Sequence, residues 1–136
     1  MKYEKIEKIY YHDTDSYQIA YHGTYVRWFE AGRIELCALL GIDIHQLQDM
    51  DILLPVVDLN CRYRTAAKLF DELKITTTIE KLTTFSITFS HDIENITTGA
   101  HTAKGTTTIV VTDKNGKLAR KMPVSLYENF EKGLNS

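Results

Sequence analysis

The spacing of hydrophobic residues changes along this chain and divides it into a helical part and a sheet part. From Thr24 to Leu40, apolar residues recur three or four positions apart, which is the spacing of one helix face. Thr24 is a suitable N-cap for this helix, and Gly41 is a suitable C′ residue. Gly32 lies inside the helix, where it predicts close approach of a strand backbone or a ligand. A helix with so many apolar residues must be largely enclosed by other elements.

Segments with strand-like patterns surround this helix. Residues 3–11 read as a first strand and residues 12–23 as a loop. After the helix, a short helical turn with Asp43 as its cap is expected. Apolar and polar residues then alternate in four strand-like segments, at residues 56–63, 73–79, 85–93 and 102–111. Residues 113–116 form a hairpin turn signal, residues 117–121 a plausible last strand, and Pro123 opens a helix over residues 124–134.

This order of elements predicts the architecture. Consecutive strands joined by short turns form an antiparallel sheet, and one helix cannot cover a flat sheet of that width. A strongly curved sheet wrapped round the helix buries both. The expectation is therefore an α+β fold in which a curved antiparallel sheet of five or six strands encloses one long central helix. The length of 136 residues predicts a single domain over residues 1–136.

Composition narrows the functional classes. The formal net charge is -2, so no nucleic acid partner is expected. No apolar run approaches the ~18 residues of a membrane span, and the first residues contain no signal-peptide core, so no stable membrane insertion is expected. The two cysteines, Cys37 and Cys61, are expected to be reduced and buried in a cytoplasmic protein.

Four titratable side chains lie just before the predicted helix, namely His12, Asp13, Asp15 and His22. Asp-Thr-Asp at a strand end is usually a turn in which side chains accept backbone hydrogen bonds. The four residues are also of types that bind zinc, but no tight motif supports a metal site, and none is expected. In a third interpretation these residues are catalytic groups beside a helix N-terminus. The residues alone leave the turn and the catalytic interpretation open.

Spacing and residue types in this region form a motif. It consists of Asp13-Thr14-Asp15, Tyr21-His22, Tyr25, Phe29-Glu30 and Arg33, followed by Asp71-Glu72-Leu73. Over residues 3 to about 112, the chain resembles the hotdog fold. In particular, it resembles the 4-hydroxybenzoyl-CoA thioesterase family and its relatives, the acyl-CoA thioesterases associated with bacterial Tol-Pal operons. The chain departs from the family pattern at Thr24, where Asn is usual, and at Phe70, where Gly is common.

The resemblance implies roles for individual residues in the hydrolysis of an acyl-CoA thioester. Asp15 would act as nucleophile or as general base, and His22 would be the second catalytic residue. The backbone N–H of His22, at the helix N-terminus, would polarise the thioester carbonyl, and Gly23 would allow close approach. Tyr21, Gly23, Tyr25 and Glu30 are the expected substrate-binding residues, whereas Asp13 is interpreted as structural. No cofactor is implied.

The resemblance also implies a homodimer or homotetramer, with the active site at a subunit interface. Alternative substrates are thioesters of acyl-carrier protein or aromatic thioesters of the naphthoyl type, and a non-catalytic acyl-CoA-binding module is a further possibility. Glu30 and Arg33 could instead be an ordinary helical ion pair. Two basic groups are candidate phosphate patches: Arg62, Arg64 and Lys68, and Lys117, Arg120 and Lys121.

Overall fold

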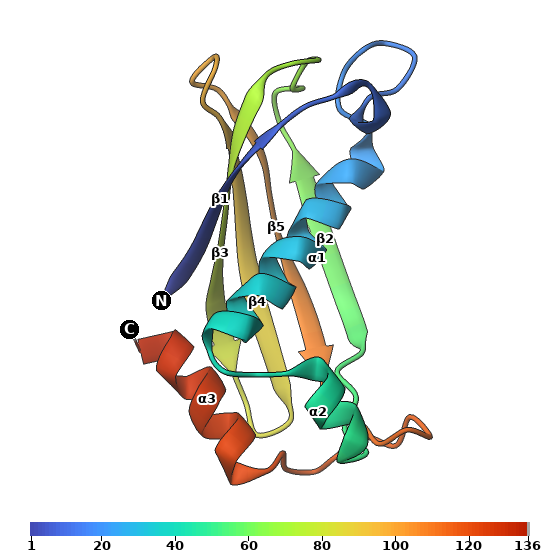
Figure 1. Ribbon diagram of the computed structural model, residues 1–136, viewed down its shortest axis with the longest axis vertical. Helices are drawn as coiled ribbons and strands as arrows, with labels where there is room; N and C mark the ends of the chain where they lie inside the picture. The colour runs from blue at the N-terminus through green and yellow to red at the C-terminus, as the bar shows by residue number, and fades with distance from the viewer. Residues whose placement is uncertain (136) are drawn as a thin grey trace.

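A five-stranded antiparallel sheet with strand order β1-β3-β4-β5-β2 forms the frame of the protein in a computed structural model that describes residues 1–135 (Figure 1). The strands are β1 (Lys2–Lys8), β2 (Val56–Tyr63), β3 (Glu72–Leu82), β4 (Ser86–Asn95) and β5 (His101–Val110). The helices are α1 (His22–Leu39), α2 (Ile44–Asp49) and α3 (Val124–Asn135). This arrangement confirms the α+β class and the antiparallel sheet predicted from the sequence.

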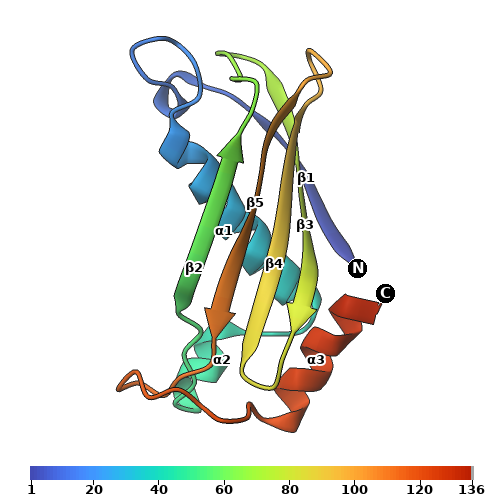
Figure 2. The same cartoon turned by 180° about the vertical axis from the view of Figure 1, so that it is seen from behind.

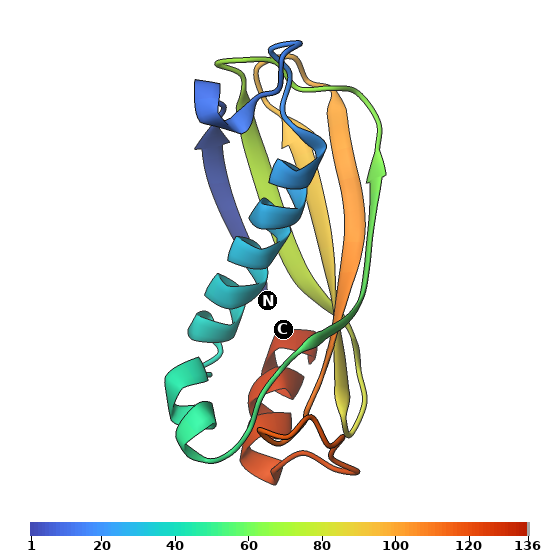
Figure 3. The same ribbon diagram turned by 90° about the vertical axis from the view of Figure 1, so that its right-hand side faces the viewer.

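Helix α1 lies along one face of the curved sheet, as the view from the side shows (Figure 3). Its buried face includes Tyr25, Trp28, Phe29 and Leu36, which follow the helical spacing seen in the sequence. The helix is followed by Gly41 with φ of 77°, a left-handed conformation that favours glycine, as predicted. The apolar face of α1 is thus buried against the sheet, and its first turn reaches one end of the molecule (Figure 1).

Helix α1 comes into close contact with the sheet at Gly32. A Cβ atom at this position would collide with the side-chain oxygen of Thr77 on β3. The prediction of close approach by a strand is therefore correct, although the approaching group is a side chain and not the strand backbone.

The inner face of the sheet follows the alternation seen in the sequence. On β3 and β4, the alternate residues facing α1 are buried, namely Leu73, Ile75, Thr77, Ile79, Ile87, Phe89, His91 and Ile93. Strand β2 differs, because it forms one edge of the sheet, opposite β1 (Figure 2). Val57 and Leu59 on this edge strand are 58% and 41% exposed. Edge strand β2 therefore presents apolar side chains to solvent.

Two expected strands differ from the prediction: the first is shorter, and the last does not form. Strand β1 stops at Lys8, and Tyr11–Asp13 form a 3-10 turn instead of continuing the strand. The turn forms because the Asp13 carboxylate accepts the backbone N–H of Tyr10. Residues 117–121 form no strand, and Leu118 makes a single bridge to Thr112. Both sides of β5 are already occupied by β4 and β2, so this segment can pair only beyond the end of β5.

The other local predictions agree with the structure, except that the predicted burial of Cys61 is wrong. Asp43 caps α2 by accepting the backbone N–H groups of His45 and Gln46, and α3 begins directly after Pro123. Both cysteines are free; Cys37 is buried, whereas Cys61 is only partly buried, because it lies on the open edge strand β2. Between residues 1 and 135, no helix has the length and apolarity needed to cross a membrane.

Candidate active site

Asp13 joins the loop after β1 to the start of α1. Its side chain is buried and accepts hydrogen bonds from the backbone N–H of Tyr10 at 3.0 Å and from the guanidinium of Arg27 at 3.1 Å. Its carbonyl oxygen accepts the backbone N–H of Tyr21 at 2.8 Å and the hydroxyl of Thr24 at 3.2 Å. The loop and the first turn of α1 are therefore held together through one residue.

Asp15 lies in a tight turn two residues further on. Its backbone N–H donates to the carbonyl of Ile19 at 3.0 Å, and its carbonyl accepts the N–H of Gln18, which has φ of 61°. Oδ1 of Asp15 accepts the backbone N–H of Tyr17 at 2.8 Å, whereas Oδ2 has no hydrogen-bond partner among residues 1–135. The turn interpretation is thus correct for one carboxylate oxygen, and the other is available for chemistry.

The first turn of α1 carries unsatisfied backbone donors. The helix begins at His22, and the N-cap is Tyr21, whose side chain makes no capping hydrogen bond. Thr24 is therefore not the N-cap, and its hydroxyl is bonded instead to the carbonyl of Asp13. Within the described part of the chain, the N–H groups of His22 and Gly23 have no acceptor. They lie at the positive end of the helix dipole, where an anion is stabilised.

Asp15 and His22 line one open cavity of about 310 Å³ at this end of the molecule. The loop before α1, the first turn of α1, the end of β2 and the start of β5 together form its wall. The other lining residues are Tyr17, Ile19, Ala20, Tyr25, Tyr63, Arg64, Thr65, Ala66 and Thr102. The cavity therefore combines a carboxylate, an imidazole and three phenol rings beside the helix N-terminus.

The other expected binding residues take different positions. Tyr25 lines the cavity but is 3% exposed, so its ring is part of the wall. The ring of Tyr21 packs against that of His22, with centroids 4.2 Å apart, and a Cβ at Gly23 would lie 2.7 Å from the Tyr21 ring. Glu30 lies on the exposed face of α1 and is not among the residues that line the cavity. No ion pair joins it to Arg33 in the described residues.

Tyr63 is a cavity residue that the sequence pattern did not assign to the site. Its hydroxyl donates a hydrogen bond to the carbonyl oxygen of His22 at 2.8 Å. Its ring packs edge-on against Tyr25, with centroids 5.4 Å apart. The alternation of β2 puts Tyr63 on the same face as Leu59 and Cys61, but the sequence alone does not bring this strand end beside the start of α1.

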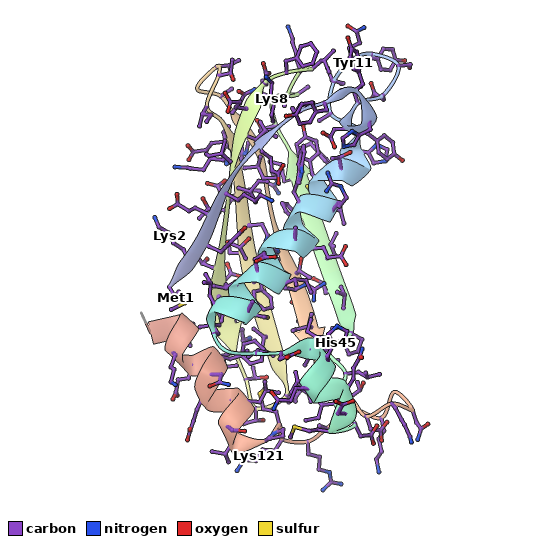
Figure 4. The ribbon with its side chains drawn as sticks, in the orientation of Figure 1. Met1, Lys2, Lys8, Tyr11, His45 and Lys121 are labelled. Atoms are coloured by element: carbon purple, nitrogen blue, oxygen red, sulfur yellow. The ribbon has the colours of Figure 1, made fainter. Side chains whose placement is uncertain are left out.

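The two basic groups lie in different places. Arg64 of the first group lines the cavity, next to Tyr63. Lys121 of the second group lies at the end of the molecule opposite Tyr11 (Figure 4). The second group is therefore remote from the cavity, and the first remains a candidate for contacts with a phosphate.

His12, Asp13, Asp15 and His22 were also considered as metal ligands. Through residue 135, no three His, Cys, Asp or Glu side chains gather in a way that could hold a metal ion. His12 is exposed and pairs with Asp13 at 3.4 Å, and neither residue lines the cavity that contains Asp15 and His22.

Sequence comparison connects this geometry to known proteins. The family described as "Thioesterase-like superfamily" matches residues 10–130 of the chain. The protein of Bacillus subtilis named "Putative acyl-CoA thioesterase YneP" is 30% identical over 107 residues, which are 79% of this chain and 77% of that protein. The acyl-CoA thioester hydrolase YbgC of Escherichia coli is 30% identical over 88 residues, 65% of this chain and 66% of its own length.

Solved structures of thioesterases share the fold. The 1,4-dihydroxy-2-naphthoyl-CoA thioesterase Slr0204 of Synechocystis superposes with a TM-score of 0.87 at 16% identity, covering 100% of this chain and 99% of that one. A DHNA-CoA thioesterase of Staphylococcus aureus superposes with a TM-score of 0.85 at 25% identity, covering 96% and 89%. The hotdog fold expected from the sequence is confirmed by these likenesses.

Proposed function

The chain belongs to the thioesterase-like superfamily, and from this premise we propose that it hydrolyses an acyl-CoA thioester to a free acid and coenzyme A. One observation carries the proposal. Asp15 and His22 line the same cavity, and His22 begins a helix whose first N–H groups have no acceptor in residues 1–135. A carboxylate thus lies in the same cavity as donors that can stabilise an oxyanion.

The donors at the start of α1 stabilise the charge that forms when the thioester carbonyl is attacked. The N–H of His22 is the first candidate, and the N–H of Gly23 can add to it. A single donor of this kind typically contributes ~3 kcal/mol to the stability of the transition state. The helix dipole acts in the same direction, because its positive end faces the oxyanion.

The carboxylate of Asp15 attacks the thioester carbonyl or activates the water that does so. This carboxylate either adds to the carbonyl carbon and forms an acyl-enzyme anhydride, which water then hydrolyses, or removes a proton from an attacking water. In both routes the C–S bond breaks, a C–O bond forms, and coenzyme A leaves as a thiolate. The conjugate acid of that thiolate should have a pKa near that of a free thiol, ~8.5, so departure needs little protonation.

The remaining site residues have supporting roles in this proposal. The exposed imidazole of His22 positions the water or the carbonyl, or transfers a proton. Tyr25 forms part of the cavity wall, whereas Tyr21 and Gly23 do not line the cavity and would act only through their position beside His22 at the start of α1. Glu30 lies outside the cavity wall, so it would contact only a part of the substrate that extends along α1.

We further propose that the enzyme is a homodimer or homotetramer in the cytoplasm. Edge strand β2 supports self-association, because an exposed edge with apolar side chains such as Val57 and Leu59 invites pairing with another strand. The opposite edge strand, β1, carries the ion pairs Lys2–Glu4 and Lys5–Glu7, and charged residues disfavour such pairing. Two free cysteines agree with a reducing compartment.

An aromatic acyl group is the second candidate substrate. The rings of Tyr17, Tyr25 and Tyr63 line the cavity and could stack on an aromatic acid. The likeness at 25% identity to a DHNA-CoA thioesterase of Staphylococcus aureus favours the same candidate. A panel of straight-chain and aromatic acyl-CoAs, with release of coenzyme A followed by a thiol reagent, separates the two substrate classes.

The same assay distinguishes coenzyme A esters from carrier-protein esters, and hydrolysis from binding alone. Acyl-carrier-protein thioesters of the preferred acyl group would be cleaved faster than the coenzyme A esters if the carrier protein is the natural substrate. Binding of acyl-CoA without any release of thiol would indicate a non-catalytic module and would contradict the proposal.

A further inference from the structure

We infer that Tyr63 is a positioning residue for hydrolysis, because its hydroxyl fixes and polarises the peptide that carries the Gly23 N–H. The inference rests on the proposed function, since it assigns to Tyr63 the control of a donor at the start of α1. Tyr63 is the last residue of β2, so a strand would set the geometry of the oxyanion site on a helix 41 residues away in sequence.

The geometry of the contact is direct. The Tyr63 hydroxyl donates to the carbonyl oxygen of His22 at 2.8 Å. A carbonyl at this position in a helix normally also accepts the N–H four residues later, and a carbonyl oxygen has lone pairs for two donors. Tyr63 therefore adds a second hydrogen bond to a carbonyl of the first helical turn.

Holding this carbonyl also holds the neighbouring N–H. The peptide between His22 and Gly23 is planar and trans, so its C=O and N–H groups point in opposite directions. When the carbonyl is fixed by a donor from β2, the direction of the Gly23 N–H is fixed with it. Hydrogen bonds in series also strengthen one another by about 10–30% each, so the Gly23 N–H becomes a better donor to an oxyanion.

Asp13 restrains the first turn of α1 at Tyr21 and Thr24, but among residues 1–135 Tyr63 is the one side chain that bonds the peptide between His22 and Gly23. The N-cap of α1, Tyr21, makes no side-chain hydrogen bond, and glycine at position 23 has unusual backbone freedom. Tyr63 is 46% exposed, but desolvation of its partly covered phenol raises the pKa of Tyr63 to about 12, so its hydroxyl remains a donor near neutral pH. The phenol is therefore the group that orients this peptide during the reaction.

Tyr63→Phe tests the inference, because it removes the hydroxyl and leaves the ring that packs against Tyr25. The matched control is Tyr127→Phe on α3, which removes a phenol hydroxyl from a half-buried ring at the other end of the molecule. We expect kcat of Tyr63→Phe on the best acyl-CoA of the panel to fall about tenfold, less than the 10²–10³-fold cost of losing a donor outright. We expect KM to stay within about twofold, because binding of the coenzyme does not depend on this peptide.

Two further measurements separate positioning from a purely structural role. The amide resonance of Gly23 in ¹⁵N-labelled protein should shift in Tyr63→Phe and stay in place in Tyr127→Phe. Replacing Tyr63 with 3-fluorotyrosine keeps the hydroxyl donor and should keep wild-type kcat, whereas a role limited to ring packing would make all the aromatic replacements equivalent.

The outcomes distinguish this inference from the proposed function. If the wild-type protein cleaves no thioester of the panel, the proposed function fails, and the inference fails with it. If the wild type is active and Tyr63→Phe retains kcat within twofold, or changes KM alone, only the inference is overturned. A Tyr63→Phe protein that does not fold, together with a 3-fluorotyrosine protein that folds but has lost activity, would also overturn it.

Discussion

The ring of Phe29 on α1 lies flat on the imidazole of His91 on β4, with ring centroids 4.4 Å apart and planes 9° from parallel. The imidazole is fully buried, and its two nitrogens are hydrogen-bonded to Thr77 at 3.1 Å and Thr107 at 3.0 Å. Burial, together with the nearby positive charge of Arg33, lowers the pKa of His91 to about 3. The sandwich of helix and sheet thus encloses a histidine that must stay neutral.

Because His91 stays neutral in the folded protein, we expect the protein to lose stability in mild acid. The folded pKa, about 3, is lower than the ordinary value of 6.5, so the unfolded chain binds more protons between these values. The stabilising contribution is complete above pH 6.5 and is lost as the pH falls from 6.5 towards 3. We expect the free energy of unfolding to be lower by about 2 kcal/mol at pH 5 than at pH 7 from this group alone.

Urea unfolding at pH 5 and pH 7 checks this expectation. His91→Gln should remove most of the difference between the two pH values, whereas His45→Gln, at an exposed position on α2, should leave it unchanged. The same pH dependence in wild type and His91→Gln would show that His91 is not responsible.

Asp15→Asn should abolish most of the hydrolysis. The asparagine keeps an oxygen that can accept the Tyr17 N–H but loses the charge and most of the nucleophilicity. We expect kcat to fall at least ~10²-fold, with KM little changed and the fold retained. Steady-state kinetics on the best acyl-CoA measure both constants, and near-normal kcat in a folded protein would mean that the segment is only a turn.

Asp13→Asn is the matched comparison at the neighbouring carboxylate. It weakens the bonds to Tyr10 and Arg27, which hold the loop on α1, so we expect a loss of about 1–3 kcal/mol in unfolding free energy. Activity should fall much less than in Asp15→Asn. The opposite ranking of the two variants in kcat would exchange the proposed roles of the aspartates.

His22→Ala should have an intermediate effect on the rate. The substitution removes the imidazole but leaves the backbone N–H of residue 22 at the start of α1. We therefore expect kcat to fall less than in Asp15→Asn. A kcat equal to that of the wild type would exclude a catalytic role for the imidazole of His22.

Light scattering at micromolar concentration should detect a dimer or tetramer and no stable monomer. Leu59→Glu puts a charge on edge strand β2 and should shift the protein towards the monomer. Ile6→Glu, on the opposite edge strand β1, is the control and should leave the mass unchanged. A wild-type protein of monomer mass would contradict the proposed assembly.

Chelation should leave activity intact, because the proposed mechanism uses a carboxylate and a helix terminus. The measurement is thioester hydrolysis before and after exhaustive treatment with a chelator. Loss of activity that a single divalent ion restores would favour the metal interpretation of His12, Asp13, Asp15 and His22.

The spacing of apolar residues predicted most of the fold, because the residues that a helix or strand buries recur at the period of that element. The buried helix face with Tyr25 and Phe29 and the alternation along β3 and β4 could therefore be predicted from the sequence. The start of α1 was misplaced because Tyr21 caps the helix without a side-chain bond, so the usual chemical signal is missing. Residues 117–121 form no strand because β4 and β2 already occupy both sides of β5. The local sequence pattern contains no information about this strand order.

The candidate site was predicted only where its residues are close in sequence. Asp15 and His22 belong to one short segment, so a motif could connect them, and both line the cavity. Tyr63 comes from a strand 41 residues after His22, and its contact follows from the fold topology. The absence of Glu30 from the wall likewise follows from the rotation of α1 against the sheet, which periodicity fixes only approximately.

At Gly32 the backbone of α1 leaves no room for a side chain beside Thr77 on β3, so the placement of the helix on the sheet depends on this glycine. The oxygen of Thr77 that occupies the missing side-chain position is also bonded to His91, so a larger residue would displace both partners. Helix α1 is continuous from His22 to Leu39, and ten residues of helix span about 15 Å. We therefore expect a methyl group at Gly32 to displace the helix from the sheet, to shift its first N–H groups relative to Asp15 and to lower the proposed activity, although Gly32 does not line the cavity.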